Sequence, residues 1–219
     1  MSHSHYKYAS LFRWTVYFIG LLVMSFGIVL TIKADVGCAP WDVLHIGLYR
    51  KFGLTIGTWS IIVGIVILAL SSLLVKRLPK LGAFLNMLFV GVFIDMYMMI
   101  PYLQTPATIA GRFAMLLIGI VIAGYGMGLY ISADVGAGPR DSLMLALMDL
   151  TGWKVQYIRI AMEAFVLLIG WLLGGPVSIG TLIFCVTIGS VAGVALPQCR
   201  RITERIMEPI HMETQGLSR

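Results

Sequence analysis

One nine-residue motif occurs twice in the chain, and its acidic residues are the first candidates for chemistry. It reads ADVGCAPWD at 34–42 and ADVGAGPRD at 133–141, a constant offset of 99 residues. In each copy the glycine permits a positive φ and the proline suits the first turn of a helix. The last aspartate then falls in that first turn, where a carboxylate complements the helix dipole. The motif predicts an unwound turn that leads into a helix N-terminus.

Each copy offers two carboxylates with different expected roles. The first aspartate precedes the glycine, where it can bind a cation, carry a proton, hold a cationic group of a substrate or simply be solvated in a surface loop. The second is either a helix cap or a direct ligand, and the backbone amides beside it can hold an anionic group. The predicted substrate-binding residues are Asp35, Gly37, Trp41, Asp42, Asp134, Gly136, Arg140 and Asp141.

The two copies differ at one position that bears on specificity. Trp41 in the first copy is replaced by Arg140 in the second. In one interpretation Arg140 recognises a carboxylate or phosphate and Trp41 stacks on a ring. In the other, Arg140 is a cytoplasmic anchor and Trp41 is an aromatic residue of the membrane interface.

A second pair of charges lies inside a long apolar stretch. Arg159 and Glu163 are four residues apart and therefore share one helix face. Charges at membrane depth are costly, usually face a bundle interior or a water-filled cavity, and are commonly paired. Glu163 is either a proton-coupling carboxylate or half of a structural ion pair.

The elements that hold these residues follow from composition. The chain is 59% hydrophobic and 12% charged, with a mean hydropathy of +0.92, whereas soluble domains are about 25% charged. About 20 apolar residues cross a bilayer as a helix, and an open strand would leave unpaired backbone groups in lipid. We therefore predict an all-α membrane protein with six spans, at about 14–32, 54–75, 81–100, 113–131, 155–173 and 177–196.

The repeated motif divides these spans into two units of three, at 11–100 and 112–197. The stretch after each motif is only about ten residues long, which suits an interrupted or re-entrant helix and cannot cross the bilayer. Because three is odd, the second unit must enter from the opposite side. Inverted repeats with interrupted segments indicate a transporter's substrate site. A duplicated structural bundle without transport is the alternative.

Loop charges predict the orientation. With a cytoplasmic N-terminus, ten Lys and Arg residues lie inside and four lie outside. The arm at 1–10 and the basic amphipathic tail at 198–219 are then both cytoplasmic. The net charge of +6 therefore requires no nucleic-acid partner. The expected partners are the lipid bilayer, a small-molecule substrate and, as an option, a second copy of the chain.

No motif points to an enzyme. The three cysteines lack metal-ligand spacing, and neither a metalloprotease helix nor a serine-hydrolase elbow is present. We expect no catalytic residue, metal or cofactor.

The two motif copies, together with the glycine- and threonine-containing turn before the last span, resemble those of the YczE/YyaS/YitT group of bacterial integral membrane proteins over residues 11–197. This resemblance implies a multi-pass protein of the bacterial cytoplasmic (inner) membrane and leaves the activity open. The leading hypothesis is a small secondary transporter of a small polar metabolite, with its site between the two motif loops and proton coupling as an option. The alternative is a non-transporting accessory or assembly protein.

Overall fold

The computed structural model describes the backbone at 2–76, 78–79, 81–136 and 138–216, and side chains within 10–206. The described residues form helices and connecting loops, with no strand among them. The helices are α1 (Ser2–Lys33), α2 (Pro40–Phe52), α3 (Ile56–Val75), α4 (Leu81–Met98), α5 (Ile109–Ser132), α6 (Pro139–Thr151), α7 (Val155–Leu172) and α8 (Ile179–Gly216).

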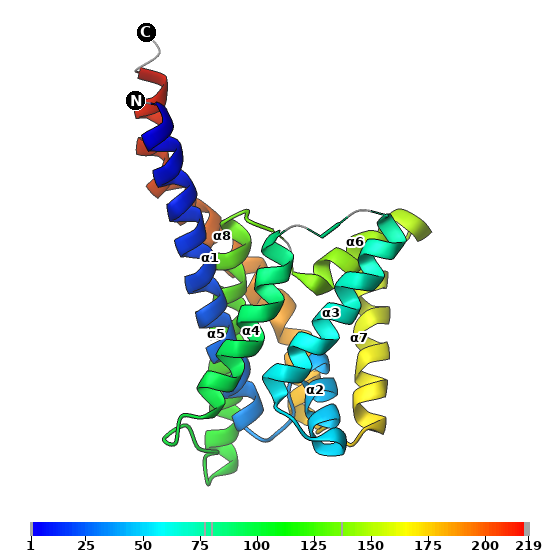
Figure 1. Ribbon diagram of the computed structural model, residues 1–219. Helices are drawn as coiled ribbons and strands as arrows, with labels where there is room; N and C mark the ends of the chain where they lie inside the picture. The colour runs from blue at the N-terminus through cyan, green and yellow to red at the C-terminus, as the bar shows by residue number, and fades with distance from the viewer. Residues whose placement is uncertain (1, 77, 80, 137, 217–219) are drawn as a thin grey trace.

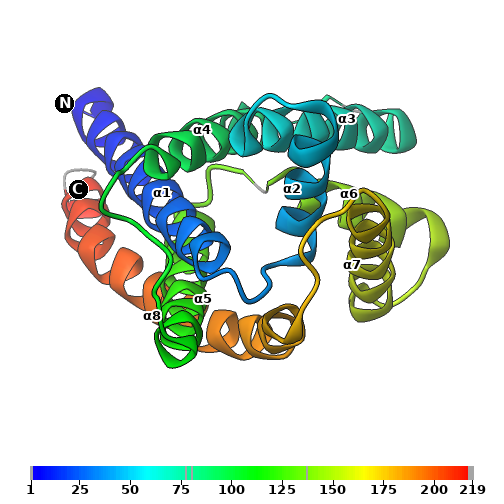
Figure 2. The same ribbon diagram turned by 90° about the horizontal axis from the view of Figure 1, so that it is seen from below.

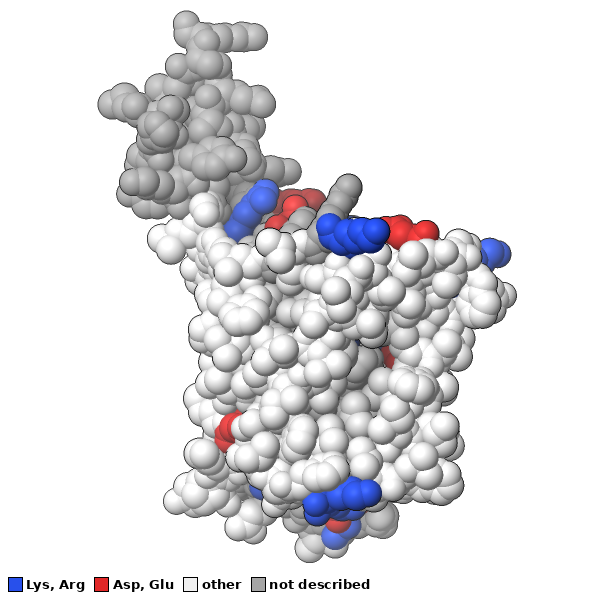
Figure 3. All heavy atoms as spheres, turned by 45° about the vertical axis from the view of Figure 1, so that its right-hand side comes forward, with Lys and Arg blue, Asp and Glu red and all other residues white. Residues whose placement is uncertain are grey.

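Six of the described helices are long and apolar enough to cross a membrane, as the sequence predicts. The candidate spans are Ser10–Lys33, Ile56–Val75, Leu81–Met98, Ile109–Ser132, Val155–Leu172 and Ile179–Ile206. Figure 3 shows Lys, Arg, Asp and Glu mainly at the two ends of the molecule, with a broad uncharged belt between them. This distribution suits a bilayer. At the C-terminal end α8 continues without a break past residue 198, where the predicted basic tail begins.

The two remaining helices, α2 and α6, are the short ones that follow the repeated motif. Each has 13 residues and begins at the motif proline, so each is about 20 Å long at 1.5 Å per residue. Each ends where a glycine takes a positive φ, at Gly53 and Gly152. Figure 1 shows both starting within the bundle, with α2 running to its lower end and α6 to its upper end.

Corresponding helices in the two halves of the chain run in opposite directions. In Figure 1, α1, α4 and α7 run downward, whereas α3, α5 and α8 run upward, and both termini lie at the same end. Each spanning helix of the first half therefore runs opposite to its counterpart in the second half.

The centre of the fold is the crossing of α1 and α5, where glycines let the two backbones touch. A Cβ atom at Gly27 would meet the backbone of Ala123 and Gly119, and one at Gly126 would meet the backbone of Met24. Small residues allow such close approach between membrane helices. Gly27 and Gly126, which lie 99 residues apart in the sequence, are therefore both packing positions.

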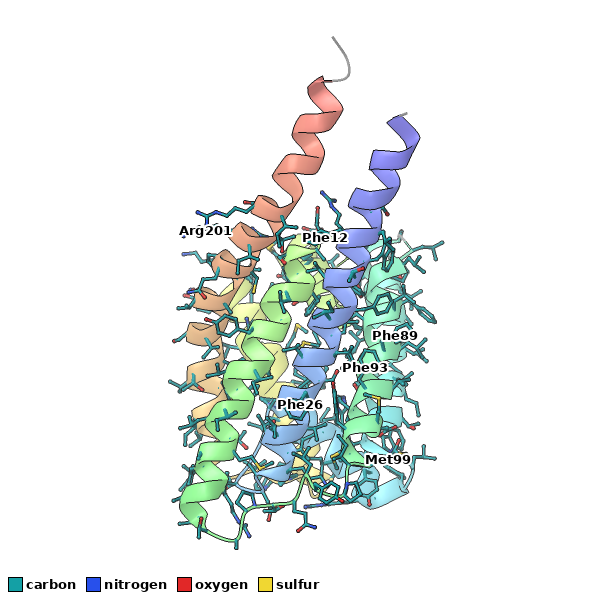
Figure 4. The ribbon with its side chains drawn as sticks, turned by 90° about the vertical axis from the view of Figure 1, so that its left-hand side faces the viewer. Phe12, Phe26, Phe89, Phe93, Met99 and Arg201 are labelled. Carbon is teal, nitrogen blue, oxygen red and sulfur yellow. The ribbon has the colours of Figure 1, made fainter. Side chains whose placement is uncertain are left out.

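Aromatic side chains fill the seam between α1 and α4. Phe18 on α1 meets Phe89 on α4 in a T-shaped arrangement with ring centroids 4.9 Å apart, and Phe26 meets Tyr97 at 5.2 Å. Figure 4 shows Phe26 on α1 and, facing it, Phe89 and Phe93 on α4. These contacts join α4 to the central helix pair.

The two halves are not packed alike. Within the first half α3 lies along α4, but for the described residues α7 makes no comparable contact with α8, and Figure 2 shows these two helices apart. A Cβ at Gly91 on α4 would lie 2.5 Å from the Ile61 side chain, whereas one at the counterpart Gly189 on α8 would meet no described atom within 4 Å. The second half is the more open one.

Asp95, which lies near the end of α4, holds the start of α3. Its carboxylate accepts hydrogen bonds from the Gly57 amide at 2.8 Å and the Thr55 hydroxyl at 2.5 Å. We expect Asp95→Ala to lower the free energy of unfolding by about 1–2 kcal/mol, because an exposed helix end loses its acceptor. Thermal unfolding in detergent measures the loss. Thr108→Ala, which removes one cap bond to Gly111 at the start of α5, is the control; an equal or larger loss there would contradict the role given to Asp95.

Candidate functional site

A cavity of about 180 Å³ lies inside the bundle where the N-terminal ends of α2 and α6 meet. Residues from all eight described helices line it. Its polar lining residues are Asp42, His45, Ser60, Asn86, Tyr130, Arg140, Asp141, Arg159 and Glu163. Because α2 and α6 each begin at a motif proline, the last residues of both motif copies are brought to this one place. The cavity is smaller than the ~300–1,000 Å³ typical of pockets for drug-sized ligands.

The lining follows the sequence repeat. Twenty-four of its 27 residues form twelve pairs separated by 99 positions, or by 98 between α4 and α8. Several pairs join unlike residues: Trp41 with Arg140, His45 with Met144, Ser60 with Arg159, Gly64 with Glu163, and Asn86 with Phe184. The two halves thus supply the same positions but different chemistry.

Trp41 and Arg140 meet directly. The guanidinium carbon of Arg140 lies 4.6 Å from the centroid of the Trp41 ring, within range of a cation–π interaction. Among the described residues Arg140 has no hydrogen bond or ion pair to a carboxylate. Its side chain is solvent-accessible because it faces the cavity. A guanidinium carries five N–H donors, so Arg140 presents free donors to whatever enters.

Asp42 and His45 form a buried polar pair on α2. Each is 2% exposed, and the Asp42 Oδ1 and His45 Nδ1 atoms are 3.7 Å apart, beyond hydrogen-bond distance. Neither atom has a hydrogen-bond partner in the described part of the chain. Burial lowers the pKa of His45, an effect that the neighbouring Asp42 opposes. The neutral imidazole is therefore favoured.

Asn86 on α4 is a third unpartnered buried group in the cavity wall. It is 6% exposed, and its side-chain Nδ2 has no partner among the described atoms. Nearby, the Tyr130 hydroxyl donates a long hydrogen bond of 3.4 Å to the Asp141 carboxylate. Leaving buried polar atoms unpaired costs about 1–3 kcal/mol each, so these groups beside the cavity are costly to the fold as long as they have no partner.

Arg159 and Glu163 on α7 complete the charged lining. The Arg159 Nε donates to Glu163 Oε1 at 3.1 Å, so the predicted pair on one helix face is present. Both side chains are partly exposed and line the cavity.

The structure does not bring the first aspartates of the motif to the cavity. Asp35 and Asp134 lie just beyond the ends of α1 and α5 with φ of 54° and 55°, a left-handed conformation that Asp tolerates better than most residues. The Asp35 carboxylate is 62% exposed and pairs with Arg112 at 3.2 Å, and Asp134 is exposed. Both residues thus terminate helices at the surface.

Gly37 and Gly136, which occupy the same position in the two motif copies, are also outside the cavity lining. A Cβ at Gly37 would lie 2.7 Å from the Thr181 amide, and one at Gly136 would lie 3.0 Å from the Gly82 Cα. Each therefore lets its loop pack against the start of the last spanning helix of the other half, α8 or α4. Their role here is in packing.

Four polar residues of the cavity lining lay outside the predicted site: His45, Ser60, Asn86 and Tyr130. His45 differs from its repeat counterpart Met144, and Asn86 is a polar residue in an apolar span; both signals were available in the sequence. Tyr130 precedes the motif by three residues, and only the packing of α5 shows that it reaches the same space.

We expect Asp134→Gly to leave the fold intact or stabilise it slightly, because glycine adopts a positive φ without strain. Asp134→Val should lower stability by about 1–2 kcal/mol, since a β-branched residue is poorly accommodated there. Thermal unfolding of both variants measures the difference. Equal melting temperatures for the two would contradict a helix-terminating role.

Comparison of the sequence with known proteins assigns the chain to a family. A protein-family model described as a family of unknown function (DUF6198) matches residues 11–197. The chain belongs to this family.

Relatives agree with this assignment. The chain is 45% identical to an uncharacterized membrane protein, YczE, of Bacillus subtilis (strain 168) over 187 residues, which cover 85% of this chain and 86% of that protein. It is 29% identical to the uncharacterized protein YyaS of the same organism over 86% of this chain and 94% of that one. An uncharacterized protein of Haemophilus influenzae is 32% identical over 81% of this chain and 80% of its own length. No solved structure matches. The resemblance to the YczE and YyaS proteins is confirmed.

Proposed function

We propose that this membrane protein is a small secondary transporter of the bacterial cytoplasmic membrane, which carries a small polar metabolite through the central cavity. The observation that carries the proposal is the cavity lining, in which Asp42, His45 and Asn86 are buried and unpartnered. A bundle that served only as a scaffold would gain by filling this space with apolar side chains, because unpaired buried polar groups cost free energy.

The architecture we propose is a pair of inverted repeats with α2 and α6 as re-entrant half-helices. Two observations support it: the cavity lining pairs positions 98 or 99 residues apart, and corresponding helices run in opposite directions (Figure 1). Half-helices whose N-termini meet near the midplane are a recurrent design for substrate sites. The loop charges favour both termini in the cytoplasm.

The unequal packing of the two halves supports alternating access. In the mechanism we propose, the structure represents one state, with α3 packed on α4 and α7 separated from α8. In the opposite state α3 separates from α4, and α7 packs on α8. Rocking of one repeat against the other around a fixed site is the usual motion of such transporters.

Labelling of the cavity from each side tests the mechanism. In a background free of Cys38, Cys185 and Cys199, a cysteine at Ser60 should react with impermeant reagents from both membrane faces. A disulfide between Gly64→Cys and Met87→Cys would lock α3 to α4, since a Cβ at Gly64 would lie 3.3 Å from the Met87 Cβ, close to disulfide geometry. Locking should abolish labelling from one side. Labelling from one face only, unchanged by the lock, would favour the non-transporting accessory protein.

Proton coupling is the option that Glu163 offers to this transporter. If Glu163 carries the coupled proton, Glu163→Gln should abolish accumulation driven by a pH gradient in proteoliposomes while substrate exchange continues. If the residue serves only the ion pair with Arg159, driven accumulation and exchange should fall together. The ratio of the two rates at equal protein content decides between these roles.

A further inference from the structure

The central cavity presents unpaired groups of opposite charge to the same small space. Arg140 offers its guanidinium donors from α6, and the described residues give it no carboxylate partner. Asp42, 2% exposed, contributes its carboxylate to the cavity lining from α2, and its Oδ1 has no hydrogen-bond partner among the described residues. The two residues begin the short helices that meet there, so a single small ligand can reach both.

The charge of the lining limits what that ligand can be. At the ordinary charges of these groups, three carboxylates, on Asp42, Asp141 and Glu163, face two guanidiniums, on Arg140 and Arg159, which is a formal charge of −1 when the His45 imidazole is neutral. A phosphate dianion would add to this negative charge. A simple cation would satisfy Asp42 but leave Arg140 without a partner. A ligand with one positive and one negative group satisfies both and leaves the net charge unchanged.

We infer that the ligand is a small zwitterion, whose carboxylate is held by Arg140 and whose ammonium group is held by Asp42. A planar guanidinium matches a carboxylate with two parallel hydrogen bonds, and the Asp42 carboxylate accepts from the ammonium. The Asn86 side-chain amide donates a further hydrogen bond to the carboxylate of the ligand. The volume of about 180 Å³ suits a ligand of the size of a small amino acid.

This inference rests on the proposed function only for its location, since binding can be measured without transport. The panel of zwitterions is glycine, alanine, serine, β-alanine and γ-aminobutyrate. Each is compared with the amine that lacks its carboxylate and the acid that lacks its ammonium group; for alanine these are ethylamine and propionate. The readout is the melting temperature of the full-length protein in detergent. At about a hundredfold excess over Kd we expect at least one zwitterion to raise it by about 5 °C, and its amine and acid to have much smaller effects.

Charge-removing variants assign the two ends of the ligand. Arg140→Gln should weaken zwitterion binding at least ~10-fold and make the matched amine bind as well as the zwitterion. Asp42→Asn should weaken zwitterion binding to a similar extent and make the matched acid bind as well as the zwitterion. Arg140→Lys, which keeps the charge, should retain part of the preference. The matched controls are Arg112→Gln and Asp35→Asn, because that pair lies outside the cavity.

The outcomes separate this inference from the transport proposal. Zwitterion binding with no flux in proteoliposomes supports the inference and overturns transport. Binding or flux of an amine or an acid without preference for the zwitterion overturns the inference and leaves transport standing. A panel in which no zwitterion shifts the melting temperature overturns the inference, as does an unchanged preference in folded Arg140→Gln and Asp42→Asn.

Discussion

Gly27→Val should lower the free energy of unfolding by at least ~3 kcal/mol. This is the largest loss of stability that we expect from any single substitution. A Cβ at this position would lie 2.7 Å from both the Ala123 Cα and the Gly119 carbonyl oxygen, closer than real Cβ contacts. These are backbone atoms of α5, so no rotamer change can relieve the clash, and overpacking of this kind typically costs 1–3 kcal/mol or more. The helices α1 and α5 would have to separate.

The melting temperature in detergent and the yield of monodisperse protein measure this effect. Gly189→Ala is the matched control, because its Cβ would meet no described atom within 4 Å. Alanine also favours a helix over glycine by up to about 1 kcal/mol, so the control should be neutral or stabilising. A Gly27→Val protein as stable as the control would mean that α1 and α5 do not pack as closely as described.

Asp42→Ala should reduce ligand binding and flux by roughly 100-fold, whereas Asp35→Ala should change them less than about twofold. Both residues belong to the same copy of the motif, but only Asp42 is buried in the cavity wall. Losing one member of a buried, desolvated charge contact costs about 2–5 kcal/mol, and about 1.4 kcal/mol corresponds to a tenfold change in affinity. Asp35 lies at the surface beside Arg112.

The measurement is counterflow of the zwitterion that gives the largest thermal shift, in proteoliposomes with matched protein content. Circular dichroism and size-exclusion profiles show whether both variants are folded. A loss with Asp35→Ala as large as with Asp42→Ala would contradict the division of the motif into a surface part and a cavity part.

The spans and short helices were predictable because they depend on local chemistry. Lipid requires long apolar helices, so α3, α4, α5 and α7 lie close to their predicted bounds. Proline at the start and glycine at the end of α2 and α6 delimit helices too short to cross. The end of the last span was less predictable, since charged residues after 198 ended the apolar run but did not end the helix.

Within the motif, the sequence separated the roles of the aspartates only in part. It offered capping or ligand binding for Asp42 and Asp141, and a functional or solvated role for Asp35 and Asp134. The choice depends on which way each carboxylate faces. Asp35 itself adopts the left-handed conformation just after α1, and its carboxylate lies at the surface beside Arg112. This orientation depends on the path of the loop that joins α1 to α2.

Composition and local pattern alone determined that the chain is a membrane protein, that six of its described helices are long and apolar enough to span the bilayer, and that its short helices begin at the repeated prolines. Tertiary structure decided which half of each motif faces the cavity. It also added His45, Asn86 and Tyr130 to the site and showed α7 apart from α8. The reason is physical: hydrophobicity and helix-end preferences act over a few residues, whereas a cavity is defined by side chains from eight helices, whose arrangement depends on contacts such as that between Gly27 and α5.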